Sequence, residues 1–270
     1  MRSLLILGSI VALFTVACSQ GEEAATGENE GAVVGGTSET GCSAPAGKAI
    51  VTFSTDRRSA TATTPDPNAM MTECVINVQE VKVLGLAAAP QEKINRALGT
   101  VIKASGFNIK ACEEPFEVDG RAQVQYNADN LLSVATWIGS YSSGAAHPNS
   151  YGAFMSFDLE SGERLQLKDV ITPEGKETVK AELLAAINRT KDDADTKALW
   201  VEAATGLMSQ SSNVIEDFTI AKTGLRFRLD NHVAHVMQGA VRDSGYIVPF
   251  AKIKQFIKPG TSIAKLAGVR

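Results

Sequence analysis

Alternating apolar and polar residues mark the strands that this chain predicts. Residues 49–54 (AIVTFS) and 74–84 (CVINVQEVKVL) alternate and are rich in β-branched side chains, as half-buried strands are. Further strands are expected at residues 122–126, 131–141, 151–159, 164–167, 218–221, 225–229 and 246–249. Short segments rich in Asn, Asp and Gly separate several neighbouring strands, which predicts antiparallel hairpins.

Apolar residues at helical spacing predict a smaller number of helices. In residues 90–104, Ile94, Leu98 and Ile102 recur every four positions behind a proline, which indicates an amphipathic helix. Other helices are expected at residues 175–191, 195–208 and 250–257. Strands grouped in runs, with helices inserted as blocks, predict an α+β fold. We expect a largely antiparallel sheet with helices packed on one side.

The strand and helix blocks divide into two adjoining subdomains. The smaller covers residues 48–130 and the larger residues 131–260, with a tail at 261–270. The chain shows no repeating strand–helix–strand unit, which argues against a doubly wound parallel sheet.

The N-terminus carries a targeting signal. Residues 4–15 are almost wholly apolar and have the length of a signal-peptide core. The small residue Ala17 before Cys18 resembles the bacterial lipobox, in which the cysteine is diacylated and becomes the mature N-terminus. This resemblance implies a signal peptide at residues 1–17, and Ser19 after the cysteine favours the outer membrane. The alternative is an ordinary secretory signal cut near Ala17.

Residues 18–47 form the predicted tether. They are rich in Gly, Glu, Ser and Thr and poor in large apolar side chains, so they predict a flexible linker between the lipid and the folded part. We expect the protein in the bacterial cell envelope, facing the periplasm or the surface. The net charge of −4 argues against a nucleic-acid partner, since no basic surplus neutralises phosphates.

Apart from Cys18, the chain has Cys42, Cys74 and Cys112. An oxidising envelope favours one disulfide and leaves one thiol over. The candidate pair Cys74–Cys112 would join the folded part to itself, whereas a bond from Cys42 to either would attach the linker. The sequence leaves these alternatives open. No Cys-x-x-Cys pair or Cys/His cluster indicates zinc, and no cofactor is expected.

A series of short motifs follows in a set order across the larger predicted subdomain. They are SGAAHPN at 143–149, FDLESG at 157–162, LQLKDV at 165–170, FTI at 218–220, GLRF at 224–227 and VPF at 248–250. Over residues 131–258 this series resembles the RsiV-type exported domain family. That domain of unknown function occurs in lysozyme-sensing anti-sigma factors, beside peptidoglycan deacetylase domains and in bacterial lipoproteins. Residues 49–130 are similar, more loosely, to the smaller domain that precedes it.

The resemblance implies an α+β module outside the cytoplasm, some of whose members bind lysozyme by protein–protein contact. It implies no catalysis, because the deacetylase activity of some relatives belongs to a separate domain. We therefore expect a non-enzymatic binding module for a lysozyme-like muramidase or another envelope protein, and an acidic chain is compatible with a cationic partner. The candidate binding residues surround the loop at 143–150: Tyr141, His147, Pro148, Asn149 and Tyr151.

Two alternative functions remain at this stage. The first is an envelope hydrolase or metal-dependent enzyme that uses His147 with His232 and His235, although a spacing of three puts two strand residues on opposite faces. Asp158 and Asp169 also suggest a carboxylate pair for glycoside hydrolysis. Each stands beside a turn, where aspartate commonly caps backbone amides. The second alternative is a structural lipoprotein associated with peptidoglycan.

Overall fold

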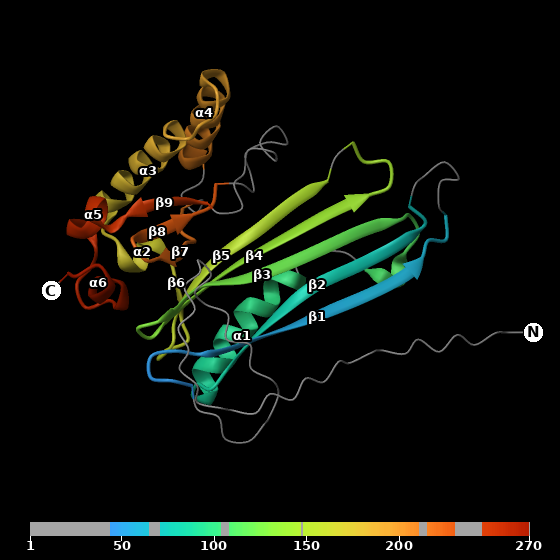
Figure 1. Ribbon diagram of the computed structural model, residues 1–270, viewed down its shortest axis with the longest axis horizontal. Helices are drawn as coiled ribbons and strands as arrows, with labels where there is room; N and C mark the ends of the chain where they lie inside the picture. The colour runs from blue at the N-terminus through green and yellow to red at the C-terminus, as the bar shows by residue number, and fades with distance from the viewer. Residues whose placement is uncertain are drawn as a thin grey trace, which may run out of the picture.

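Two β-sheets of unequal size organise the chain in the computed structural model, which describes residues 44–64, 71–103, 108–146, 148–210, 215–229 and 245–269. A long sheet of six strands carries a helix on one face, and a sheet of three short strands sits with most of the helices at one end of it (Figure 1). The arrangement confirms the α+β prediction with largely antiparallel strands.

The six-stranded sheet has its strands in sequence order. The strands are β1 (Ile50–Thr61), β2 (Glu73–Leu84), β3 (Phe116–Ala128), β4 (Leu131–Ser142), β5 (Asn149–Asp158) and β6 (Arg164–Leu165). All neighbours are antiparallel except β2 and β3, which run parallel. The chain crosses between them through α1 (Ala88–Lys103) and the 3-10 helix η1 (Ile109–Ala111). Strands from both sides of residue 130 therefore share one sheet.

Backbone pairing extends some strands beyond their apolar segments. The outer half of β1 is mostly exposed and polar, yet it pairs with β2 as far as Thr61. Its side chains alone do not show a strand, because an edge strand takes its conformation from its one neighbour. The turn from β3 to β4 is a two-residue hairpin, with φ of 54° at Asp129 and 61° at Asn130. Asp and Asn tolerate this left-handed conformation, which such hairpin turns require.

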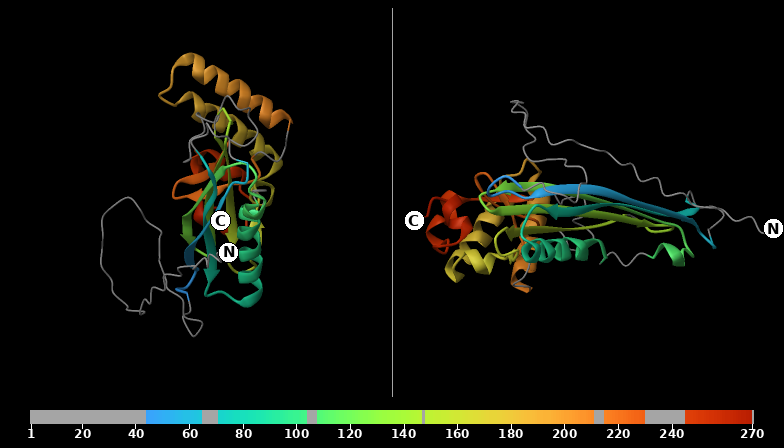
Figure 2. Two further views of the ribbon diagram at one scale, coloured as in Figure 1. Left: turned by 90° about the vertical axis from the view of Figure 1, so that its right-hand side faces the viewer. Right: turned by 90° about the horizontal axis from the view of Figure 1, so that it is seen from below.

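The two faces of the long sheet pack against different partners. Leu132, Val134 and Phe157 point to one face, where Ile94 and Leu98 of α1 cover them. Figure 2 shows α1 lying along this face, below the sheet in its right-hand view. Residues that alternate with these, beginning with Ser133, point to the opposite face, and the three-stranded sheet docks there.

The three-stranded sheet belongs to the C-terminal part of the chain. It comprises β7 (Thr219–Ala221), β8 (Gly224–Phe227) and β9 (Tyr246–Pro249). The helices of this part are α2 (Leu167–Val170), α3 (Pro173–Asn188), α4 (Ala194–Gln210), α5 (Phe250–Ile253), η3 (Lys254–Phe256) and α6 (Ser262–Leu266). None of the helices in the described ranges has the length and apolar character needed to cross a membrane.

Helix α3 illustrates why the C-terminal core forms. Thr172 caps its first turn by accepting a hydrogen bond from the Gly175 amide, and Pro173 occupies the first helical position. Val179, Leu183 and Ile187 follow at four-residue spacing and are fully or almost fully buried in the core that contains the three short strands. This spacing is the one that predicted the helix.

The end of the chain differs from the expected tail. Residues 262–266 form helix α6, and Ile263 within it is fully buried. Thr261 caps this helix through the Ala264 amide, and the Ser262 hydroxyl donates a 2.9 Å hydrogen bond to Asp158. Two adjacent buried residues, Ile263 and Ala264, in so short a segment leave little periodicity to detect, so the contact with Asp158 is visible only in the folded chain.

A pair of buried serines joins the two sheets. Ser133 on β4 and Ser156 on β5 are both inaccessible to solvent, and their hydroxyl oxygens lie 2.7 Å apart. The Ser156 hydroxyl donates to the carbonyl of Phe218 at 2.8 Å, and the Ser133 hydroxyl accepts from the amide of Ile220 at 3.0 Å. Two backbone groups beside and within the edge strand β7 are thus satisfied by the face of the larger sheet.

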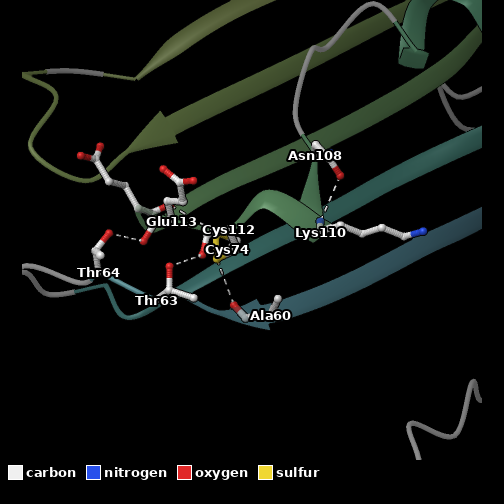
Figure 3. Close-up of a disulfide and its surroundings, with 9 residues drawn as sticks. Ala60, Thr63, Thr64, Cys74, Asn108, Lys110, Cys112 and Glu113 are labelled. Carbon is white, nitrogen blue, oxygen red and sulfur yellow. Dashed lines mark hydrogen bonds between the residues drawn. A yellow bond between two sulfur atoms is a disulfide. The ribbon is translucent and has the colours of Figure 1, made fainter.

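A disulfide closes the opposite end of the long sheet. Cys74 at the start of β2 is bonded to Cys112 just after η1, with the two Cα atoms 5.9 Å apart (Figure 3). Cys74 is fully buried in a small apolar cluster with Ile76, Phe116 and Ile138. The structure thus confirms the candidate pair and excludes a bond from Cys42 to either of these cysteines.

Removing this disulfide is expected to destabilise the fold. Replacing Cys74 and Cys112 together with alanine should lower the free energy of unfolding by about 2–4 kcal/mol, because the bond closes a loop between positions 38 apart. Urea unfolding followed by circular dichroism measures the change. Cys42→Ala is the matched control and should leave the unfolding curve unchanged. Equal unfolding free energies for the double variant and the parent chain would contradict the role given to the bond.

Candidate functional site

The end of the long sheet that lies away from the C-terminal helices is called here the distal tip. It comprises residues 61–64, 71–75, 112–117 and 141–146, and it contains the disulfide and the described start of the β4–β5 loop (Figures 1 and 2). These segments come from four different strands and their connections, so the sheet brings together residues that are distant in sequence.

The segment after η1 holds the distal tip together. The carbonyl of Cys112 accepts from the Thr63 amide at 3.1 Å, and the carbonyl of Glu113 accepts from the Thr64 amide at 3.0 Å. The hydroxyls of the same two threonines donate to these carbonyls at 3.4 and 2.9 Å (Figure 3). On its other side, the carbonyl of Pro115 accepts from the Ser143 amide at 2.9 Å. One disulfide-anchored segment therefore connects the end of β1 to the start of the β4–β5 loop.

The distal tip presents acidic side chains to solvent. Glu73, Glu113, Glu114 and Glu117 are all exposed, and none of them forms an ion pair within the described part of the chain. Lys110 is the single cationic residue between positions 108 and 117. The described segments of the distal tip contain these four carboxylates and no lysine or arginine, so they carry a local negative charge; Lys110 and Arg58 lie just outside them.

The structure places the predicted binding residues beside this acidic surface. Tyr141 is the last residue but one of β4; it is half-buried and pairs with Glu117 on β3. Pro148 and Asn149 are exposed at the start of β5. The backbone of Tyr151 pairs with Ile138, but its side chain lies outside the described residues, as does the whole of His147. The glutamates were missed because they are separated in sequence. The Cys112-Glu113-Glu114 run was the available signal.

Asp158 and Asp169 each accept hydrogen bonds from nearby backbone amides. One carboxylate oxygen of Asp158 accepts from the amides of Glu160 and Ser161 and from the Ser161 hydroxyl. Asp169 accepts from the Gln166 amide at 2.9 Å, at the start of α2. The capping interpretation is therefore correct for both carboxylates.

The hydrogen bonds to Asp158 also affect its titration. Partial burial raises the pKa of Asp158, but hydrogen bonds from Ser161, Ser262 and Glu160 outweigh this and hold the pKa below its ordinary value. A carboxyl with a lowered pKa stabilises the fold above its unfolded-state pKa, and that stabilisation is lost as the pH falls through the folded-state value.

The metal-site alternative falls largely outside the described residues. His147, His232 and His235 are all in segments that the structure does not describe. Among the residues it does describe, no three His, Cys, Asp or Glu side chains gather closely enough to hold a metal ion.

Asp158→Asn is expected to destabilise the protein by about 1 kcal/mol at pH 7. The charged carboxylate that accepts hydrogen bonds from Glu160, Ser161 and Ser262 is replaced by a neutral amide, which accepts weaker ones, and partial exposure to solvent keeps the loss small. The difference from the parent chain should shrink as the pH falls below about 4, because the carboxyl of the unfolded chain binds a proton there whereas the carboxyl of the folded chain does so only at lower pH. Thermal unfolding between pH 3 and 7 measures both effects. The control, Glu92→Gln, removes an exposed carboxylate on α1 and should show no such pH dependence. A difference that is constant over this pH range would refute the assignment.

Comparison with known proteins bears on the fold. No family model and no curated protein matches the sequence. Among solved structures, a DUF3298 family member from Bacteroides fragilis NCTC 9343 superposes with a TM-score of 0.50 at 14% identity, covering 83% of this chain and 100% of that one. A DUF3298 family protein from Pseudomonas aeruginosa PAO1 gives 0.51 at 13% identity, covering 77% and 95%. The chain thus shares its fold with DUF3298 proteins, although sequence identities this low say nothing about activity.

Proposed function

We propose that this protein is a non-enzymatic binding module that docks a cationic protein on its distal tip. The observation that carries the proposal is the group of four exposed glutamates held on a disulfide-anchored, hydrogen-bonded end of the sheet. Acidic side chains that lack an intramolecular cation attract a basic partner and orient it during approach.

The covalent and hydrogen-bonded order of the distal tip favours binding. The disulfide and the amide hydrogen bonds to Cys112, Glu113 and Pro115 hold these segments before any partner arrives. A surface that is already ordered loses less conformational entropy on association, which leaves more of the contact energy for affinity.

The partner proposed is a lysozyme-like muramidase. The RsiV-type resemblance supports this choice, because known members of that family bind lysozyme. The acidic surface supports it independently, because it suits a cationic protein. The DUF3298 neighbours support the fold and leave the partner to experiment.

Binding is expected to depend on the glutamates of the distal tip. Glu113→Gln with Glu114→Gln should weaken the affinity for purified lysozyme about tenfold, equivalent to about 1.4 kcal/mol, and flatten its salt dependence. Isothermal titration calorimetry at low and physiological ionic strength measures both.

A charge-matched control separates a local site from a general charge effect. Glu92→Gln with Glu202→Gln changes the net charge by the same amount through exposed residues on α1 and α4. This variant should bind lysozyme like the parent chain. No heat with the parent chain at high micromolar lysozyme, or equal weakening by both double variants, would sink the proposal.

The location proposed is the bacterial envelope, with a lipid on Cys18 and the outer membrane as the favoured site. Support comes from the apolar segment at residues 4–15 and the small residue before the cysteine. Such an anchor would hold the module at a membrane while the linker of residues 18–47 lets it stand away.

Lipidation is tested by metabolic labelling. Expression of the full chain in a bacterium with radiolabelled palmitate should label the parent protein, and Cys18→Ser should abolish the label. Cys42→Ser, in the predicted linker, is the matched control and should be labelled like the parent. Incorporation that survives Cys18→Ser would contradict the anchor.

A further inference from the structure

A cavity of ≈670 Å³ opens on the face of the long sheet opposite α1, beside the three-stranded sheet. It is separate from the distal tip and plays no part in the proposed docking. Its volume lies in the range of small-molecule sites. Its lining consists of Gln79, Arg121, Ala122, Gln123, Gln125, Ala135, Thr136, Trp137, Phe154, Arg226 and Arg228. These described lining residues include three arginines and neither aspartate nor glutamate.

Two of the arginines reach the cavity from the second sheet. Leu225 and Phe227 on β8 point into the C-terminal core and are fully buried. Side chains alternate along a strand, so Arg226 and Arg228 point the other way, toward the long sheet. Arg228 is only 8% exposed although it carries a full charge. A buried guanidinium group needs an anion or polar groups around it, and Arg228 has an interaction partner within the protein.

Arg226 has one hydrogen-bond donor that its described surroundings leave unsatisfied. Its Nη1 donates to the side-chain oxygen of Gln125 on β3. Its Nε is buried without a hydrogen-bond partner in the described part of the chain. Burial also lowers the pKa of Arg226, which indicates that the surroundings provide little compensation for the charge.

Glycines on the sheet leave space for the large side chains of the cavity. A Cβ on Gly152 of β5 would collide with Nη1 of Arg228, so this guanidinium lies directly on the backbone of the sheet. A Cβ on Gly139 would lie 2.5 Å from the Trp137 ring, so the indole lies along β4 over that glycine. Arginine, indole and amide side chains thus line the same face of the sheet within the cavity.

The third arginine, Arg121, lies at the rim of the cavity. Its Nε donates to Asp119 at 3.2 Å and its side chain is 78% exposed, so it contributes less than the other two. The amides of Gln79, Gln123 and Gln125 supply neutral donors and acceptors between the cations.

We propose that this cavity binds a small, polar organic anion of about the size of a monosaccharide. Arg226 and Arg228 would hold its carboxylate or phosphate group, since guanidinium groups pair with either through parallel hydrogen bonds. The Trp137 ring would cover the apolar side of the molecule, and the glutamine amides would contact its hydroxyl groups. We call this the arginine cavity.

The test compares three sugars that differ at one position. The full chain in mild detergent, carrying Trp200→Phe so that Trp137 is its one tryptophan, is titrated with glucose, glucuronate and glucose 6-phosphate. At least one of the two anions should produce a saturable change in Trp137 fluorescence at tenfold or more lower concentration than glucose. The stronger of the two identifies carboxylate or phosphate as the group bound. No saturable change with either anion, or equal affinity for glucose, would overturn the proposal.

Two variants connect binding to the arginines. Arg226→Gln should weaken anion binding at least tenfold, whereas Arg96→Gln, an exposed arginine on α1 across the sheet, should leave it within twofold. Gln125→Glu places a carboxylate against Arg226 and occupies its guanidinium without removing it. This second variant tests the same contact even if Arg226→Gln does not fold. It should weaken anion binding at least tenfold without lowering the melting temperature. Unchanged anion affinity in Gln125→Glu, or equal affinities in the two arginine variants, would overturn the assignment.

Discussion

The architecture depends on a short hydrogen-bonded chain buried between the two sheets. Each serine hydroxyl has one proton, and that of Ser156 goes to the carbonyl of Phe218. The remaining bonds then have one consistent order, in which the Ile220 amide donates to Ser133 and Ser133 donates to Ser156. In a buried setting each bond polarises the next, and loss of either hydroxyl would leave backbone groups unsatisfied. These hydrogen bonds therefore fix where β7, and with it the small sheet, docks on the face of the large sheet.

The docking position of the small sheet determines which side chains line the arginine cavity on the same face of the large sheet. With β7 held on β4 and β5, the next strand along, β8, directs Arg226 and Arg228 over the same face, where Gly152 leaves room for a guanidinium. The docking occupies only one end of the long strands. Their other end extends away from the C-terminal helices and carries the disulfide and the acidic side chains (Figure 1).

Local patterns predicted the hairpins, helix α3 and the presence of one disulfide, because alternation, four-residue spacing and cysteine count are all visible in short segments, but they left open which cysteines pair. What joins distant segments was not visible. Ser133 and Ser156 stand in apolar strands as small polar residues with no local sign that they meet. Arg226 was noticed only as a letter in the GLRF motif, and Glu73 lies some forty positions before Glu113. The candidate site could not be predicted without the register of the strands, and that register depends on the whole fold.

The polar outer half of β1 has a consequence for proteins held close together. β1 is an edge of the long sheet, so among the described residues no strand lies beside one side of its backbone. An uncovered strand of this length would invite a second chain to add to the sheet and begin an aggregate. Arg57 and Arg58 are exposed along it and Asp56 pairs with Arg58, so an approaching strand would have to bury charges. The charged side chains of this strand thereby disfavour edge-to-edge pairing with a second chain.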